Sequence, residues 1–148
     1  MKWLTIILFT LLSTEAVAQD PKSERMINHR RAAFTLMSSY FSRILNVVDG
    51  EVDFDKNSVI QSARTVEMLS KLPWIGFAPG TEFGETRAKP EIWFEEDEFE
   101  KLAVDMQNKV RDLRIAAEKG DRAQIKLAFV TARKSCGACH DRYRKKIE

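Results

Sequence analysis

The sequence predicts an all-α protein folded as an antiparallel four-helix bundle. Four segments read as amphipathic helices, and in three of them the apolar residues recur at alternating gaps of three and four, the spacing of helices that pack in bundles. Two short connections and one long one join the segments, and short connections make neighbouring helices antiparallel. No segment shows the alternation of apolar and polar residues that a half-buried strand requires.

The first predicted helix begins at Asp20 and Pro21, an N-cap acceptor followed by proline at the first helical position. It ends at Asp49 and Gly50, a common C-terminal signal. Arg30 is the only charged residue of its inward row. Burying an unpaired guanidinium costs free energy, so we expect an anionic partner near Arg30. The full row is Ile27, Arg30, Phe34, Met37, Phe41, Ile44 and Val48.

The three later helices also have boundary signals. The second starts near Asp55 and is stopped by Pro73. The third follows the acidic residues 95–98, which suit the positive end of a helix, and it ends at Gly120. Asp121 caps the fourth. The inward rows are Val59, Ala63, Val66, Leu69 and Leu72 in the second helix, Phe99, Ala103, Met106, Val110, Leu113 and Ala117 in the third, and Ile125, Phe129, Ala132, Cys136, Cys139 and Tyr143 in the fourth.

The connection over residues 73–94 is long for a small domain, and loops of that length are usually functional or disordered. Its aromatic residues argue against disorder, because so much aromatic surface needs something to cover. We therefore do not expect this segment to be disordered.

Residues 1–18 read as a secretory signal peptide, with an apolar run followed by Ala16, Val17 and Ala18 in the pattern that signal peptidase cleaves. The run is too short to span a bilayer, which takes about 20 residues. Residues 19–148 then form one domain. We expect this domain in the periplasm, with no membrane partner. The net charge of +2 is nearly neutral and gives no reason to expect nucleic acid as a partner.

The only two cysteines of the chain stand in the segment KSCGACHDRYRKKIE, residues 134–148. Three chemistries use such a motif. An exported CxxC can form a disulfide or a redox pair, although that pair normally follows a strand in a βαβ unit. Zinc needs four ligands, and the only other histidine, His29, is on the first helix. The third chemistry is covalent haem attachment, for which CxxCH is the known signature.

Helix geometry favours haem attachment. Cys136 and Cys139 are three residues apart and lie on one face of a helix, which suits thioether bonds to two vinyl groups at one edge of a porphyrin. The next residue, His140, is then placed to bind the iron from one side. The sequence therefore predicts one haem c, attached covalently through Cys136 and Cys139, with His140 as the metal ligand.

Further stretches carry a family resemblance: HRRAAFTLMSSYF at 29–41, LPWIGFAPGTEFGE at 72–85, PEIW at 90–93 and SCGACHDRYRKK at 135–146. Essentially the whole chain after residue 18 resembles the cytochrome c prime family, class II c-type cytochromes with CxxCH near the end of a four-helix bundle. The resemblance implies a five-coordinate, high-spin iron bound by His140. It also implies an arginine close to that histidine, which Arg144 matches, and the i, i+4 spacing puts both on one side of a helix.

The resemblance also assigns the other face and the edge of the haem. Phe34 matches the first-helix residue that covers the iron, where low-spin relatives of the cytochrome c-556 type have a ligating methionine. A phenyl ring offers no lone pair, so we expect the position to stay vacant. A haem propionate is the expected partner of Arg30, and Trp74, Phe77 and Trp93 are the expected walls of the haem pocket. Arg31, Glu85 and Thr86 match residues along the haem edge, although the chain has two extra residues around 86–89.

These features predict a periplasmic haem protein that binds NO and CO, an NO scavenger or carrier. We do not expect an enzyme, because no acid or base is placed on the Phe34 side. The alternative is an electron-transfer cytochrome with low-spin, c-556-like iron and redox partner proteins. The resemblance further implies a homodimer formed through the first two helices. The outward row Ala33, Leu36, Tyr40 and Val47 is apolar enough to support that dimer.

Overall fold

Aspartate side chains begin three of the four long helices in the computed structural model, which describes residues 20–146. Asp20 accepts hydrogen bonds from two backbone amides at the start of α1, Pro21–Val48. Asp55 does the same for one amide of α2, Lys56–Leu69. Asp121 caps α5, Arg122–Tyr143. These caps satisfy amides that a helix leaves without partners, and they confirm the predicted starts.

Helix α4, Glu96–Lys119, begins without a side-chain cap, and three acidic residues in its first turn face the positive end of the helix dipole instead. It ends at Gly120, whose φ of 82° is in the left-handed region that glycine adopts without strain. The predicted third helix and its end are therefore confirmed.

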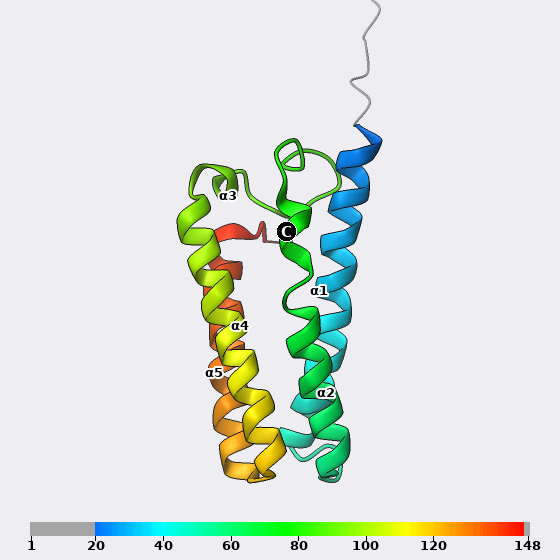
Figure 1. Cartoon of the computed structure of the whole chain (residues 1–148), viewed down its shortest axis with the longest axis vertical. Coiled ribbons are helices and arrows are strands. Elements are labelled where there is room, and N and C mark those ends of the chain that lie inside the picture. The colour runs from blue at the N-terminus through cyan, green and yellow to red at the C-terminus, as the bar shows by residue number, and fades with distance from the viewer. Residues whose placement is uncertain (1–19, 147–148) are drawn as a thin grey trace, which may run out of the picture.

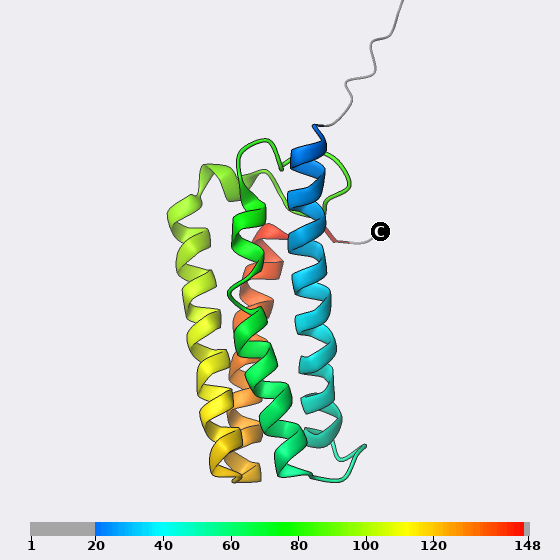
Figure 2. The same ribbon diagram turned by 45° about the vertical axis from the view of Figure 1, so that its right-hand side comes forward.

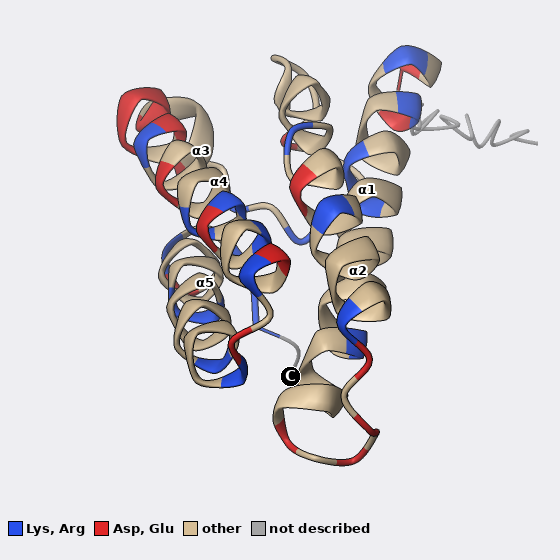
Figure 3. Cartoon of the chain, turned by 60° about the horizontal axis from the view of Figure 1, so that its bottom comes forward, with Lys and Arg blue, Asp and Glu red and all other residues tan. Residues whose placement is uncertain are grey.

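The four long helices form the predicted antiparallel bundle (Figures 1 and 2). Helix α1 packs on α2, α2 on α4, and α4 on α5. Viewed from the bottom, α1 and α2 form one pair and α4 and α5 another (Figure 3). Charged residues of both signs are scattered over the helices, with acidic residues gathered near the start of α4.

The main apolar core lies at the end of the bundle where short connections join α1 to α2 and α4 to α5. Ile44, Val59, Leu113, Ile125 and Phe129 are all almost fully buried there, as the inward rows predict. Phe41 stacks on Phe129 with ring centroids 4.3 Å apart. Burying one such large side chain stabilises the fold by roughly 2 kcal/mol, so this core stabilises its end of the bundle strongly.

The connection between α2 and α4 contains two short helices that the sequence did not predict. Helix α2 ends at Leu69, earlier than expected, and Leu72 is 42% exposed where an inward side chain was predicted. Pro73 instead starts the 3-10 helix η1, Pro73–Phe77. A four-residue helix, α3, spans Glu91–Phe94. The chain is therefore ordered through a segment that was expected to be one long loop.

Not all residues of the row predicted to face outward on the first helix are exposed. Leu36 is 51% exposed, but Ala33 is buried, so that part of the prediction is wrong. Helix α1 contacts η1 as well as α2, and this second contact widens its buried face. None of the helices within residues 20–146 has the length and apolarity needed to cross a membrane. The predicted signal peptide, residues 1–18, lies outside the described residues.

Candidate functional site

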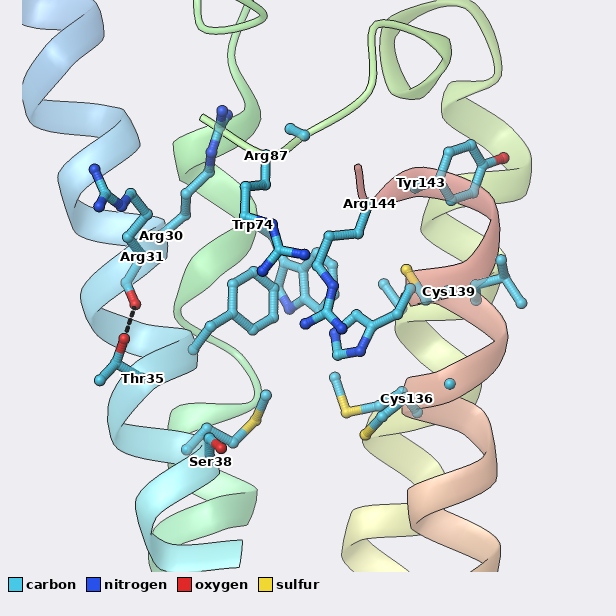
Figure 4. A pocket seen from close by; sticks show the side chains of 18 of the residues that line it. Arg30, Arg31, Thr35, Ser38, Trp74, Arg87, Cys136, Cys139, Tyr143 and Arg144 are labelled. Carbon is cyan, nitrogen blue, oxygen red and sulfur yellow. Dashed lines mark hydrogen bonds between the residues drawn. The ribbon is translucent and has the colours of Figure 1, made fainter. Parts of the chain in front are cut away.

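A cavity of about 830 Å³ lies toward the other end of the bundle, beside the long connection (Figure 4). This volume is in the range of pockets that hold small organic molecules and cofactors. Its walls come from α1, η1, α4 and α5, and residues 85–88 of the long connection cover one edge. All nine site residues predicted from the sequence line this cavity: Arg30, Arg31, Phe34, Glu85, Thr86, Cys136, Cys139, His140 and Arg144.

Helix α5 presents both cysteines to the cavity, as its inward row predicts. The thiols are half-buried and are not joined in a disulfide. Burial raises the pKa of Cys136, and it raises the pKa of Cys139 to about 11, with the neighbouring Cys136 adding to the effect. At neutral pH both groups are therefore protonated. Reactive redox cysteines have lowered pKa values, so this environment does not favour the redox interpretation.

His140 also lines the cavity, one residue after Cys139. Burial lowers the pKa of His140, and the positive charge of Arg144 lowers it further. The imidazole is therefore neutral near pH 7 and keeps a lone pair for a metal ion.

Zinc has no support among the residues that the structure describes. Within residues 20–146, no three side chains of the His, Cys, Asp and Glu types come together in a way that could hold a metal ion. The second histidine, His29, forms a 2.8 Å hydrogen bond between its Nε2 and the carbonyl oxygen of Leu72. A haem needs only one protein ligand here, so the same side chains suit it better.

Arg144 lies one helical turn after His140, as its i, i+4 spacing suggests. Helix α5 ends at Tyr143, but the amide of Arg144 still donates the last helical hydrogen bond, 3.0 Å long, to the carbonyl oxygen of His140. Beyond this amide the backbone of Arg144 is extended. In Figure 4 the side chain of Arg144 points back into the cavity.

Aromatic rings form the wall opposite α5. Phe34 meets Trp74 and Phe77 edge to face, with ring centroids 6.0 Å and 6.3 Å apart. Trp74 and Phe77 line the cavity as predicted. Trp93 is not part of its lining, so that prediction is wrong. Its indole N–H turns away and donates to the carbonyl oxygens of Phe77 and Ala78.

Arg30 is 2% exposed, yet its guanidinium is fully engaged by uncharged groups of the long connection. Nη1 donates to the carbonyl of Gly76 at 2.6 Å and to Oγ1 of Thr81 at 2.8 Å. Nη2 donates to the carbonyl of Thr81 and to Oγ1 of Thr86, both at 2.7 Å. These partners belong to the protein, so the burial of Arg30 does not by itself require a haem propionate, and that contact stays a prediction.

Burial lowers the pKa of Arg30 to about 10, while the negative charge of Glu82 works in the opposite direction. The guanidinium thus keeps its charge at neutral pH. A Cβ atom on Gly76 would lie 2.7 Å from the carbonyl oxygen of Met26 and 2.8 Å from Cβ of Arg30. Only glycine allows η1 to approach α1 this closely. Sequence reasoning missed Gly76 and Thr81 as site residues, because their role depends on Arg30.

The remaining edge residues line the cavity as the resemblance implies. Nη1 of Arg31 donates to the carbonyl oxygen of Glu85 at 3.2 Å. Thr86 accepts from Arg30 and from the amide of Ala88. Arg87, which sequence reasoning missed, adds a further cation to the same edge. In the sequence, only its position next to Glu85 and Thr86 could have indicated that Arg87 belongs to this edge.

The side chain of Tyr143 connects the end of α5 to the start of α4 by packing and by a hydrogen bond. Its ring packs edge to face on Phe99 at 5.3 Å, and its hydroxyl donates to Oε2 of Glu95 at 2.8 Å. Arg142 forms a 2.7 Å salt bridge with the same carboxylate. The hydrogen bond from Tyr143 is the largest cause of the lowered pKa of Glu95. Burial and this hydrogen bond together raise the pKa of Tyr143 to about 12.

We predict that Tyr143→Phe changes how stability depends on pH. A pKa raised from 10 to about 12 stabilises the fold fully below pH 10, and this contribution is lost as the pH rises toward 12. Urea unfolding at neutral pH should show the variant to be the less stable protein. Between pH 10 and 12 the wild type should lose more stability than the variant, and parallel curves over that range contradict the assignment.

The cavity fits a haem on three counts that the structure shows. Its walls are mostly apolar, as the porphyrin ring requires. Two thiols and a neutral imidazole face it from one helix, the donor set of c-type attachment. Arginine side chains line one edge, where they suit the carboxylates of a haem: Arg31, Arg87 and Arg144.

The fold and this cavity together define a class, the four-helix haem proteins. A family model described as cytochrome C′ matches residues 25–144. A cytochrome c′ from Alcaligenes xylosoxydans xylosoxydans is 39% identical over 128 residues, 86% of this chain and 99% of that protein. The chain therefore belongs to the cytochrome c′ family, and membership implies a covalently bound haem c.

Solved structures agree with this assignment. The crystal structure of cytochrome c′ from Rubrivivax gelatinosus has a TM-score of 0.81 at 35% identity and covers 86% of this chain and 100% of its own. The nitric oxide complex of a leucine-to-alanine mutant of cytochrome c prime from Alcaligenes xylosoxidans also has a TM-score of 0.81, at 38% identity, and covers 86% and 99% of the two chains. The predicted family and fold class are confirmed.

Proposed function

We propose that this chain is a haem c protein that binds nitric oxide and carbon monoxide. Cys136 and Cys139 each form a thioether bond to one vinyl group, and His140 is the single protein ligand of the iron. When bound, the haem iron supplies the coordination position at which a diatomic gas is held. The structures similar to this chain include a nitric oxide complex, which supports the choice of ligand.

The apolar wall on the Phe34 side is the observation that carries this proposal. Phe34 has no lone pair to offer a metal and no hydrogen to donate. The only donor on the Trp74 ring is used, because its indole N–H bonds the carbonyl oxygen of Ser70 at 2.7 Å. The hydroxyl of Thr35 donates to the carbonyl oxygen of Arg31, as the dashed line in Figure 4 shows.

The lack of a hydrogen-bond donor in this wall affects which diatomic gases the haem binds well. A bound oxygen molecule is polar and gains stability from a hydrogen-bond donor beside it, whereas NO and CO depend on such a donor far less. Phe34, Trp74 and Thr35 have no donor left for it. We therefore expect the protein to bind NO and CO and to be poorly oxygenated.

We predict that Phe34→Met converts the haem from high-spin to low-spin. A thioether at this position has the lone pair that a phenyl ring lacks, so it can act as a second protein ligand. The reduced absorption spectrum should then show sharp α and β bands, which the wild type should lack, and NO should bind more slowly. Met37→Leu is the matched control, since it alters a neighbouring cavity residue and should leave the spectrum unchanged.

The alternative, a low-spin electron-transfer cytochrome with redox partner proteins, has one observation in its favour. The thioethers of Met37 and Met106 also line the cavity. Met37, however, packs against the buried cluster of Val66, Met106, Val110 and Ala132, which accounts for its side chain without a metal. Sharp α and β bands in the reduced wild type, lost in Met37→Leu, would establish the alternative.

The cellular role follows from export. We propose that residues 1–18 direct the chain to the periplasm, where the domain carries or scavenges NO without catalysing a reaction. Fractionation of cells, with mass spectrometry of the mature N-terminus, tests this location.

We also propose a homodimer through α1 and α2, supported by the exposed Leu36. A monomer in sedimentation velocity experiments at working concentration would exclude it.

A further inference from the structure

Two segments far apart in the sequence pair at the edge of the cavity. Residues 87–89 of the long connection run antiparallel to residues 143–145 at the end of α5, around a β-bridge between Ala88 and Arg144. The amide of Lys89 donates to the carbonyl of Tyr143 at 2.9 Å, and the amide of Lys145 donates to the carbonyl of Arg87 at 2.8 Å. We call these six residues the C-terminal pairing.

Side chains of residues 87–89 reinforce the pairing. Nε and Nη2 of Arg87 both donate to the carbonyl oxygen of Lys145, at 3.1 Å and 2.7 Å. Nζ of Lys89 donates to the carbonyl oxygens of Arg142 at 2.9 Å and Asp141 at 3.4 Å. The last carbonyls of a helix have no partner within it, and a cation at this end also suits the helix dipole. Lys89 therefore completes the end of α5, whereas Arg87 bonds a carbonyl two residues beyond the helix.

The pairing also joins the two walls of the cavity. Thr86, directly before it, accepts a hydrogen bond from Arg30 on α1. Arg144, within it, is bonded through its amide to the carbonyl of His140 on α5. After α5 the chain, drawn red in Figure 1, turns away from the helix toward α1 and α2. Figure 4 shows the side chains of Arg87 and Arg144 directed into the cavity.

The pairing fixes the part of Arg144 that helix α5 does not. The amide of Arg144 makes the last helical hydrogen bond, but beyond it the backbone is extended and the residue is exposed. Residues at such ends usually fray. The bridge to Ala88 and the hydrogen bond from the amide of Lys145 to Arg87 hold this extended backbone in place.

Resting on the proposed function, we propose that Arg87 and Lys89 are positioning residues. Through the C-terminal pairing they hold the extended backbone of Arg144, and with it the side chain that lines the cavity beside His140. The proposal predicts that weakening the pairing exposes residues 144 and 145 and disturbs the bond between His140 and the iron.

The experiment compares the holoproteins of the wild type, Arg87→Ala, Lys89→Ala and Arg87→Lys. Lys126→Ala, which removes an exposed lysine elsewhere on α5, is the control. Trypsin cleavage after Arg144 and Lys145, followed by intact mass, reports how often the pairing opens. Resonance Raman spectroscopy of the ferrous protein reports the stretching frequency of the iron–imidazole bond.

We expect cleavage to be roughly tenfold faster in Arg87→Ala and Lys89→Ala, because each loses two hydrogen bonds to carbonyl oxygens. The iron–imidazole frequency should shift in the same two variants. Arg87→Lys, which keeps a donor for Lys145, should recover most of the protection. The control should match the wild type in both measurements.

Two results would overturn the proposal. Unchanged cleavage in Arg87→Ala would mean that the pairing does not depend on this side chain. Faster cleavage with an unshifted iron–imidazole frequency would mean that the pairing only closes the chain end and does not position Arg144. The reduced spectrum of the wild type with NO tests the proposed function separately, so its failure is distinguishable from both.

Discussion

Replacing Arg30 with methionine should destabilise the protein by about 3 kcal/mol and release the connection that covers the cavity. Methionine fills a similar volume but donates no hydrogen bond. Gly76, Thr81 and Thr86 then lose the four hydrogen bonds that Arg30 donates to their oxygens. Thr81 is fully buried, so water cannot replace the missing donor without opening the structure.

Arg31→Met is the matched control for this substitution. Arg31 is the next residue of the same helix, but it is exposed and forms one 3.2 Å hydrogen bond to a backbone carbonyl. Its loss should change the free energy of unfolding by no more than about 0.5 kcal/mol. Arg30→Lys should lie between the two, since one ammonium group cannot reach both sets of oxygens that the guanidinium fork bonds.

Urea unfolding of the three holoproteins measures these differences directly. Amide hydrogen exchange adds a local readout, because the amides of Thr81 and Thr86 bond within the connection and should exchange faster in Arg30→Met. Equal stability of Arg30→Met and Arg31→Met would show that the four hydrogen bonds contribute nothing net. The connection would then owe its order to the packing of Trp74 and Phe77 alone.

The long helices were predictable because their signals are local. Asp55 and Asp121 accept hydrogen bonds from amides two or three residues later, so a cap is visible within a few letters of sequence. The buried rows repeat at helical spacing, and the core of Val59, Leu113 and Phe129 follows from that spacing alone. Cys136 and Cys139 are part of such a row, which is why their inward direction was also predictable.

The connection was not predictable because its order depends on residues far away in the sequence. Thr81 is 51 residues from Arg30, and the carbonyl of Gly76 is 46 residues from it. A pattern read along the chain shows neither contact. The end of α5 is similar, since Arg144 leaves the helix to pair with Ala88. The amide of Arg144 still makes the last helical hydrogen bond, as the i, i+4 spacing suggests, but the extended backbone after it does not follow from that spacing.

The partner of Arg30 illustrates the same limit. A charged residue in an apolar row correctly indicated that a buried guanidinium must be satisfied. The sequence could not show that backbone carbonyls and threonine hydroxyls of η1 and the following loop do so. The contacts with η1 and the loop therefore explain the burial of Arg30 by themselves, and the contact with a propionate stays a prediction.

The second large effect is expected when both cysteines are replaced by serine. Serine preserves the size and polarity of the side chains at Cys136 and Cys139, but a hydroxyl does not form the thioether bond. In a host that attaches haem, the wild-type polypeptide should keep its haem after denaturation and acidified-acetone extraction. The double variant should lose all of it, and each single variant should retain it through one bond.

Ala138→Ser is the control, because Ala138 is exposed between the two cysteines and gains a hydroxyl without changing either thiol. It should keep its haem like the wild type. The native double variant is informative as well, since only His140 and the apolar walls of the cavity then hold the haem, and we expect it to dissociate on dilution. A wild type that contains no covalent haem, and whose two thiols react fully with an alkylating reagent after denaturation, contradicts the attachment. A haem that stays covalently bound in the double variant would instead require a bond to some other side chain of the cavity.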